Sequence, residues 1–131
     1  MFDYPTFGKI TKIFKSNDYY DTIVTDDYCN MIVINFEHRI VTLYARDEGN
    51  GCDSHSIFEI PNIDLSSLVG KTILCIKESA VFNDLTCMYD CKEVISLSLI
   101  FNDNATFDFK LVHHSNGYYR GWLEIKEGDP I

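Results

Sequence analysis

The sequence predicts a mainly β fold with at most a small helical part, in which two similar half-domains of antiparallel sheet pack as a sandwich or a flattened barrel. Three observations support this. Apolar and polar residues alternate along several stretches, the first half of the chain resembles the second, and helical periodicity is nearly absent. With 131 residues, 46% of them hydrophobic, the chain has the size of one domain with its own core.

The internal repeat relates residues of about 6–62 to residues of about 68–127, which is a shift of about 65 positions. Each half begins a strand after a Gly-Lys step, and each ends on the same strand type, 56–60 in the first half and 121–125 in the second. We therefore expect residues 1–131 to form a single domain built of two β repeats.

The second half is predicted to form an antiparallel meander of strands near 93–101, 105–114 and 118–126. A three-residue loop at 102–104 places apolar residues of the first two strands opposite each other, with Asn104 in the left-handed backbone region that Asn tolerates. The expected pairs are Leu99 with Phe107, Leu97 with Phe109, and Ile95 with Leu111.

A second three-residue loop is predicted to join the last two strands of this meander, with Gly117 in the left-handed bulge position. This register pairs Phe109 with Leu123 and places Trp122 on the opposite face, beside Lys110. The expected core face consists of Leu97, Leu99, Phe107, Phe109, Leu111, Leu123 and Ile125.

The first half is expected to repeat this plan, with a meander of residues 30–36, 39–46 and 54–60. Two strands precede each meander, near 8–15 and 20–25 in the first half and near 71–79 and 84–89 in the second. The helical candidate is residues 63–70, a single turn capped by Asp64 or stopped by Gly70.

The charge of the chain argues against several partners. Twenty acidic residues against eleven basic ones give a net charge of −9, so we expect no direct binding to nucleic acid or to a membrane surface. The sequence shows no apolar run that would span a bilayer and no basic, apolar leader. These features predict a cytoplasmic protein, in the host cytoplasm if it is viral.

The spacing of the cysteines predicts no metal site, and the lack of known catalytic motifs predicts a protein that is not an enzyme. The five cysteines show no zinc-site spacing, so we expect reduced and mostly structural thiols. Nucleophile elbows, Gly-rich phosphate loops and paired metal-binding histidines on a helix are also missing from the sequence. We accordingly expect no catalytic residues, no metal and no cofactor.

Two groups of residues are candidates for binding. The first is a dense acidic and aromatic stretch, which suits recognition because tyrosines offer contact area while carboxylates select a basic partner. It consists of Asp18, Tyr19, Tyr20, Asp21, Asp26, Asp27 and Tyr28. The alternative group lies around the end of the second-half meander and consists of His114, Tyr118, Arg120, Trp122 and Lys110. His113 adjoins it but is expected to point to the opposite face.

Two motifs carry a resemblance to a known family. They are the Asp-Leu-x-x-Leu-x-Gly step at 64–70 and the Ser-Asn-Gly-Tyr-Tyr turn at 115–119. Across residues of about 30–127 the chain resembles a small domain family of unknown function found in bacteriophage, bacterial and some viral genomes. Of that family's acidic, His- and Cys-containing segment, only residues 52–55 are retained here. The resemblance implies a viral or phage origin and a protein that binds something of the host.

These observations lead to one main expectation for function and two alternatives. The main one is a non-catalytic acidic binding protein, monomer or homodimer, that engages a basic surface of a host protein. The first alternative is a bacterial immunity-type protein that neutralises a toxin. The second is a small hydrolase that uses the hairpin end at His113 and His114.

Overall fold

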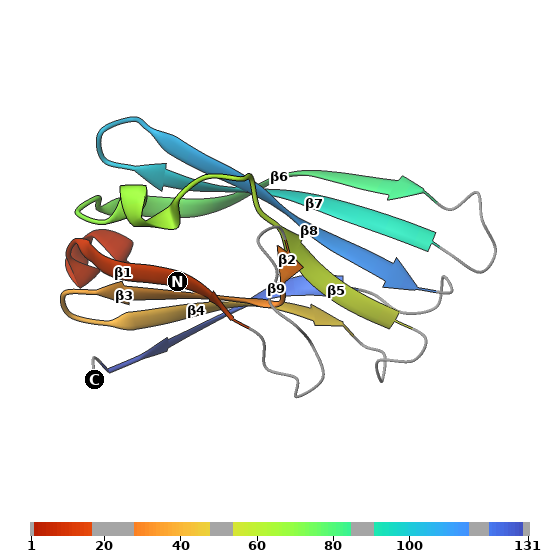
Figure 1. The fold of residues 1–131 in the computed structure, drawn as a ribbon, viewed down its shortest axis with the longest axis horizontal. Coiled ribbons are helices and arrows are strands. Elements are labelled where there is room, and N and C mark those ends of the chain that lie inside the picture. The colour runs from red at the N-terminus through yellow and green to blue at the C-terminus, as the bar shows by residue number, and fades with distance from the viewer. Residues whose placement is uncertain (1, 17–27, 48–53, 85–90, 116–120, 130–131) are drawn as a thin grey trace.

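The computed structural model describes residues 2–16, 28–47, 54–84, 91–115 and 121–129, which form two antiparallel sheets that face each other (Figure 1). The four-stranded sheet has the order β1 (Ile10–Ser16), β3 (Met31–Phe36), β4 (Ile40–Asp47) and β9 (Gly121–Gly128). The five-stranded sheet has the order β2 (Tyr28–Cys29), β5 (Ser54–Glu59), β8 (Thr106–Ser115), β7 (Cys91–Phe101) and β6 (Ile73–Asp84). The mainly β prediction is confirmed, and of its two expected forms the molecule adopts the sandwich.

The last strand of each half joins the opposite sheet, so both predicted meanders are wrong in their third strand. β5 pairs with β8 instead of β4, and β9 pairs with β4 instead of β8. Leu123 therefore lies opposite Ala45, and Ile125 lies opposite Leu43. The connections at 48–53 and 116–120 are long enough to cross the roughly 10 Å between packed sheets. Gly117, whose turn was predicted from the meander register, lies outside the described residues.

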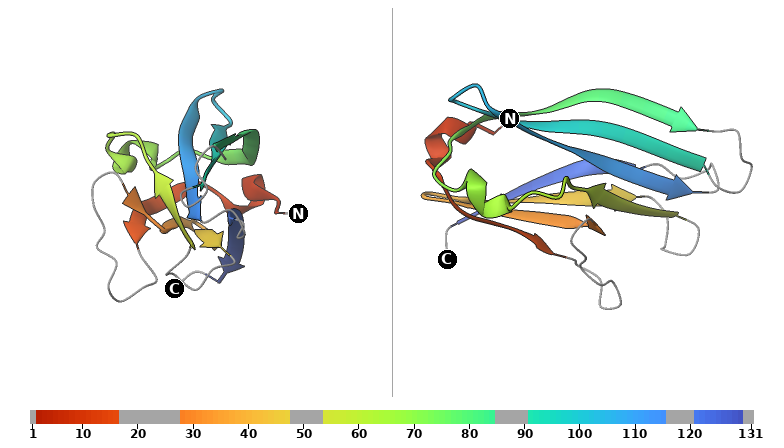
Figure 2. Two further views of the ribbon diagram at one scale, coloured as in Figure 1. Left: turned by 90° about the vertical axis from the view of Figure 1, so that its right-hand side faces the viewer. Right: turned by 45° about the horizontal axis from the view of Figure 1, so that its top comes forward.

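The exchange gives the two sheets the same strand order. One sheet reads β1-β3-β4-β9, and the other reads β6-β7-β8-β5 with β2 added at its end. In each sheet a hairpin, β3–β4 or β7–β8, is flanked on one side by the first strand of its own half, β1 or β6, and on the other by the last strand of the other half, β9 or β5. Figure 2 shows the long β6, β7 and β8 strands on one side of the molecule and β1, β3 and β4 on the other. The internal duplication itself stays a prediction.

The β7–β8 hairpin has the predicted register. Leu99 pairs with Phe107, Leu97 with Phe109 and Ile95 with Leu111. The loop between the strands is closed by two backbone hydrogen bonds, since the N–H of Phe101 donates to the carbonyl of Ala105 and the N–H of Asn104 donates to the carbonyl of Phe101. Asn104 has a φ of 69°, in the predicted left-handed region. Local alternation and turn chemistry therefore determine this hairpin.

Substitutions at Asn104 test the strain at this loop. Asn104→Ala should lower the free energy of unfolding by about 1 kcal/mol, because a Cβ without a compensating polar side chain is disfavoured at positive φ. Asn104→Gly should leave stability unchanged or raise it slightly, because glycine adopts this conformation freely. Urea melts of both variants measure the difference, and equal losses would show that φ is not the cause.

The strand boundaries differ from the predictions on the five-stranded sheet. The strand expected near 71–79 is β6, which runs to Asp84, pairs with β7 along its length and contains two register shifts, at 73/75 and 78/80. Such irregularities bend and twist an edge strand, which discourages pairing with another chain. The strand predicted near 20–25 lies outside the described residues, and so does the strand predicted near 84–89 apart from Asp84.

The single helical turn predicted between the halves is confirmed as the 3₁₀ helix η2 (Leu65–Leu68). The Asp64 carboxylate accepts a hydrogen bond of 3.0 Å from the N–H of Ser66, and Gly70 has a φ of 91°. The N–H of Gly70 donates to the carbonyl of Ile10, which ties the segment to the start of β1. A second 3₁₀ helix, η1 (Tyr4–Phe7), was not predicted.

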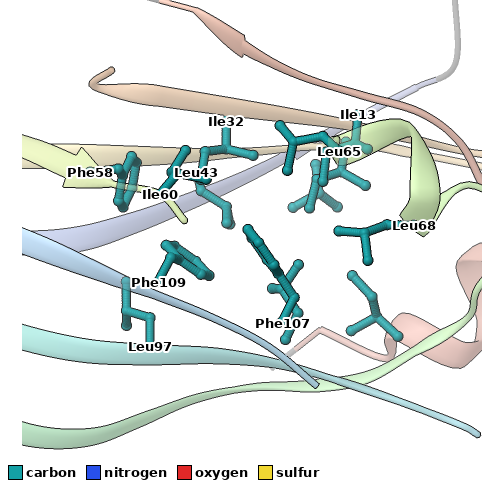
Figure 3. Close-up of a cluster of buried hydrophobic side chains, with 14 of the residues drawn as sticks. Ile13, Ile32, Leu43, Phe58, Ile60, Leu65, Leu68, Leu97, Phe107 and Phe109 are labelled. Carbon is teal, nitrogen blue, oxygen red and sulfur yellow. The ribbon is translucent and has the colours of Figure 1, made fainter. Parts of the chain in front are cut away.

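The core lies between the sheets and includes the side chains drawn in Figure 3. Of the predicted core face, five residues are buried and two are partly buried against the same cluster. The buried ones are Leu97, Leu99, Phe107, Phe109 and Leu111, and the partly buried ones are Leu123 and Ile125. The last two reach the core from β9, in the opposite sheet to the one predicted. Alternation therefore identified the inward residues even where the strand was assigned to the wrong sheet.

The thiols are divided between interior and surface. Cys29 is buried, and burial raises the pKa of its thiol to about 11, as expected for a structural cysteine. Cys75 is exposed on β6, which differs from that expectation. Cys52 and Cys87 lie outside the described residues, and only the backbone of Cys91 is described. Within the described ranges, no three His, Cys, Asp or Glu side chains are grouped to hold a metal ion.

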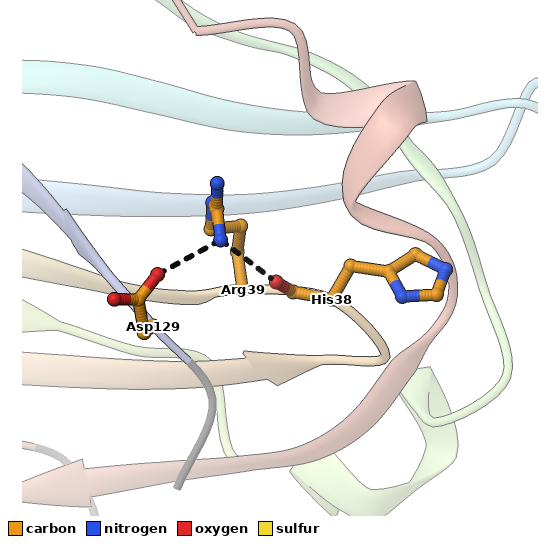
Figure 4. A network of polar contacts seen from close by, with 3 residues as sticks. All are labelled: His38, Arg39 and Asp129. Carbon is orange, nitrogen blue, oxygen red and sulfur yellow. Dashed lines mark hydrogen bonds and ion pairs between the residues drawn. The ribbon is translucent and has the colours of Figure 1, made fainter.

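The end of β9 is held beside the start of β4. The Arg39 guanidinium donates to the Asp129 carboxylate at 2.9 Å and to the carbonyl of His38 at 3.4 Å (Figure 4). The Asp129 side chain is 91% exposed, so this ion pair contributes at most about 1 kcal/mol to stability. In the part of the chain that is described, no helix has the length and apolar character needed to cross a membrane.

Candidate functional site

The acidic binding stretch predicted from the sequence lies almost entirely outside the described residues. Its members Asp18, Tyr19, Tyr20, Asp21, Asp26 and Asp27 belong to segment 17–27. Tyr28 begins β2, where its backbone pairs with Glu59 of β5. The prediction that this stretch binds a partner therefore stays a prediction.

The alternative group is divided by the exchange of strands. Lys110 is on β8, opposite Glu59 and Ser96, whereas Trp122 is on β9, opposite Arg46. Trp122 and Lys110 therefore lie in different sheets, and the prediction that they share a face is wrong because it placed β9 beside β8. His114 is half-buried on β8, and Tyr118 and Arg120 lie outside the described residues.

Trp122 belongs to a surface that we call the aromatic face, the outer side of the four-stranded sheet. In β3 the even-numbered residues Ile32 and Ile34 are buried in the core, and in β4 the odd-numbered residues Val41 and Leu43 are buried there. Their neighbours in the chain point outward because successive side chains of a strand alternate between faces. The aromatic face consists of Lys12, Phe14, Met31, Val33, Tyr44, Arg46, Trp122, Glu124 and Lys126.

An ordered set of charged side chains surrounds Tyr44 on this face. The guanidinium carbon of Arg46 lies 4.0 Å from the centre of the Tyr44 ring, and Nζ of Lys126 lies 5.4 Å from it. Glu124 is opposite Tyr44 in the ladder. Its carboxylate accepts a 3.1 Å hydrogen bond from Nε of Arg46 and lies 3.4 Å from Nζ of Lys126. These contacts hold both cations against the aromatic ring.

The electrostatics of Glu124 agree with this geometry. Burial by itself would raise the pKa of the carboxyl group, but hydrogen bonds from Arg46 and Lys126 outweigh burial and lower the pKa. The carboxylate thus stays ionised under ordinary conditions and keeps Arg46 in place. Its charge is already engaged by two cations, so it offers little repulsion to a second anion.

Two large side chains of the aromatic face are open to solvent. Trp122 is 41% exposed and Phe14 is 36% exposed. Nζ of Lys12 lies 5.0 Å from the centre of the Phe14 ring, so a cation accompanies this ring too. Aromatic and guanidinium groups are the side chains that most often dominate binding energies at protein interfaces. The face therefore has the composition of a binding surface.

Of the residues of the aromatic face, only Trp122 was predicted from the sequence as a binding residue. The signal was present as spaced pairs, Lys12 with Phe14 and Tyr44 with Arg46, in which an aromatic residue and a cation point to the same side of a strand. These pairs are far apart in the chain. Only the pairing of β9 with β4 brings Trp122 and Arg46 together.

A buried polar pair lies on the inner side of the five-stranded sheet. Ser56 and His113 are opposite each other on β5 and β8, with 2.8 Å between Oγ of Ser56 and Nδ1 of His113. They are 5% and 2% exposed, and Gly121 of β9 packs directly against them. The two side chains are thus enclosed between strands, and the hydrolase alternative at this hairpin end stays a prediction. His113 and His114 point to opposite faces, as alternation predicts.

A hollow of about 650 Å³ lies on the outer side of the five-stranded sheet. Serine and charged side chains are among its lining residues, and Oγ of Ser98 donates to the Asp108 carboxylate at 2.6 Å. Its polar lining includes Glu59, Ser79, Ser96, Ser98, Asp108 and Lys110. Ile60, Pro61, Leu97 and Phe109 complete the lining, so polar and apolar groups contribute about equally to this hollow.

Comparisons with known proteins place the chain near a viral protein without an assigned function. It is 27% identical over 107 residues to "Uncharacterized protein L278" of Acanthamoeba polyphaga mimivirus, covering 72% of this chain and 82% of that protein. No family model matches the chain, and no solved structure matches it. The two motifs predicted a resemblance to a family that includes viral proteins. The similarity to this mimivirus protein of unknown function supports the viral side of that prediction.

Proposed function

We propose that this chain is a non-catalytic binding protein, of viral origin, that holds a host protein against its aromatic face. The observation that carries the proposal is Trp122, a 41% exposed tryptophan beside an arginine that is already stacked on Tyr44 and bonded to Glu124. Because Tyr44 and Glu124 already hold the Arg46 side chain in place, Arg46 loses less conformational entropy when a partner binds.

The layout of the face supports a protein partner. Met31, Val33 and Tyr44 lie on the two inner strands, and each edge strand, β1 and β9, carries both an exposed aromatic residue and a lysine. Protein interfaces commonly have such a core of aromatic and apolar residues within a polar rim. The overall charge of −9 suits an additional contact between residues 18–28 and a basic host surface, and we retain that contact as a separate proposal.

The test compares two apolar side chains of similar exposure on opposite sheets. Trp122→Ala removes the most exposed aromatic side chain of the aromatic face, whereas Leu74→Ala removes a residue of β6 that is 45% exposed. Tagged wild type and both variants are used to capture partners from a lysate of the native host cells, and the partner is then titrated as a purified protein. We expect Trp122→Ala to weaken binding at least tenfold and Leu74→Ala to leave it unchanged.

Binding that survives Trp122→Ala would contradict the proposal and direct attention to residues 18–28. A partner that proves to be a toxin, inhibited by the chain, would place the protein in the immunity-type class. Thermal melts of both variants provide the control, since a partly exposed side chain on either sheet should change stability little.

A further inference from the structure

We infer that the aromatic face binds a short acidic peptide segment of its partner, in which carboxylates flank an apolar anchor. This inference rests on the proposed function, because it names the chemistry that the same face recognises. It differs from the basic partner expected from the net charge of the chain. Three features of the described residues support it, namely local charge, the placement of the cations, and the size of the face.

The local charge of the aromatic face is opposite in sign to that of the whole chain. Among its residues, Lys12, Arg46 and Lys126 are cations and Glu124 is an anion, so three positive charges less one negative charge leave +2. The whole chain carries −9. Seven acidic residues and one basic residue belong to the segments outside the described part, which accounts for −6 of this total. The net positive charge of these described side chains favours the approach of a carboxylate over that of a cation.

The cations are placed to receive carboxylates on both sides of an apolar anchor. Lys12 is on one edge strand and Lys126 on the other, and three strand spacings separate β1 from β9, which is about 14 Å. Phe14, Val33 and Tyr44 lie on the strands between or beside them. The Lys126 side chain is 59% exposed, so its ammonium group can contact a partner while it stays near Glu124.

The size of the face favours a short segment over a folded domain. The rows from Lys12 to Arg46 span six residues along the strands, or about 20 Å. With a width of about 14 Å, the face covers on the order of 300 Å², well below the roughly 800 Å² that each partner buries in a standard interface. An extended peptide of about six residues spans the same 20 Å. Such a segment matches the length of the surface.

Trp122 allows a direct test, because it is the single tryptophan of the chain and its emission reports on this face alone. The probes are three capped hexapeptides without aromatic residues. They are the acidic Glu-Asp-Leu-Ile-Asp-Glu, the neutral Gln-Asn-Leu-Ile-Asn-Gln and the basic Lys-Arg-Leu-Ile-Arg-Lys. We expect the acidic peptide to change Trp122 emission saturably, with a Kd at least tenfold lower than that of the neutral one. Added salt should raise this Kd.

Reversing the charges of the two lysines tests whether they select the acidic peptide. Lys12→Glu with Lys126→Glu should weaken the acidic peptide at least tenfold and allow the basic peptide to bind. The matched control, Lys77→Glu with Lys92→Glu on the five-stranded sheet, changes the net charge by the same amount and should alter the Kd less than threefold. If the reversed variant fails to fold, Lys12→Gln with Lys126→Gln is used, and the same loss of acidic-peptide binding is expected.

Several results would overturn the inference. One is tighter binding of the basic peptide by the wild type, and another is a Trp122 response to a single-stranded octathymidylate but not to the acidic peptide, which would assign the face to nucleic acid. The absence of any response would also contradict it. The proposed function fails separately, if capture of the host protein does not depend on Trp122. If capture depends on Trp122 but the contacting segment of the partner is basic, only the inference fails.

Discussion

Phe58→Ala is expected to lower the free energy of unfolding by about 3–5 kcal/mol, the largest effect among the substitutions considered for this fold. Phe58 is fully buried on β5 and packs edge to face against Phe109 of β8, with 5.7 Å between the ring centres. Its removal leaves a cavity in the core between the sheets, where neighbouring side chains relax only partly.

The matched control for this prediction is Phe14→Ala. Phe14 is also an aromatic residue of a strand, but it is 36% exposed on the aromatic face, so its loss should change stability by about 1 kcal/mol or less. Chemical denaturation of both variants gives the comparison. A double-mutant cycle of Phe58 with Phe109 should also show a coupling of about 0.5–1.5 kcal/mol. Similar losses for Phe58→Ala and Phe14→Ala would contradict the described core.

Gly121→Ala is the second large effect that we expect, a loss of about 1–3 kcal/mol. A Cβ at this position would lie 2.7 Å from Cβ and Cγ of His113 and 2.8 Å from Oγ of Ser56. Because these atoms belong to side chains that are buried and bonded to each other, they have little room to move. The strands β5, β8 and β9 meet at this contact, so the substitution tests the position of β9 relative to the other sheet.

Gly128→Ala provides a control on the same strand. An added Cβ at Gly128 would meet no atom within 4 Å, so this substitution should leave the midpoint of thermal unfolding nearly unchanged or raise it slightly. The two alanine variants differ only in what surrounds the new methyl group. If both variants melt like the wild type, the close approach of β9 to Ser56 and His113 is refuted.

Local sequence patterns determined the parts of this protein that depend on neighbouring residues. The β7–β8 hairpin followed from alternation and a three-residue loop, and Asn104 took the left-handed position that the loop requires. The turn at η2 followed in the same way from Asp64 and Gly70. Alternation also identified Leu123 and Ile125 as inward residues, although they reach the core from the other sheet. In each case the sequence signal lies within a few adjacent residues, although burial in the core supplies the stability.

The tertiary structure alone decided which strands are partners and which residues share the aromatic face. An alternating strand buries the same side chains against either inner face of a sandwich, so its pattern cannot distinguish pairing with β8 from pairing with β4. That choice depends on how the two sheets close over one core. It separated Trp122 from Lys110 and placed it opposite Arg46, so the candidate binding surface arises from contacts between segments more than seventy positions apart in the chain.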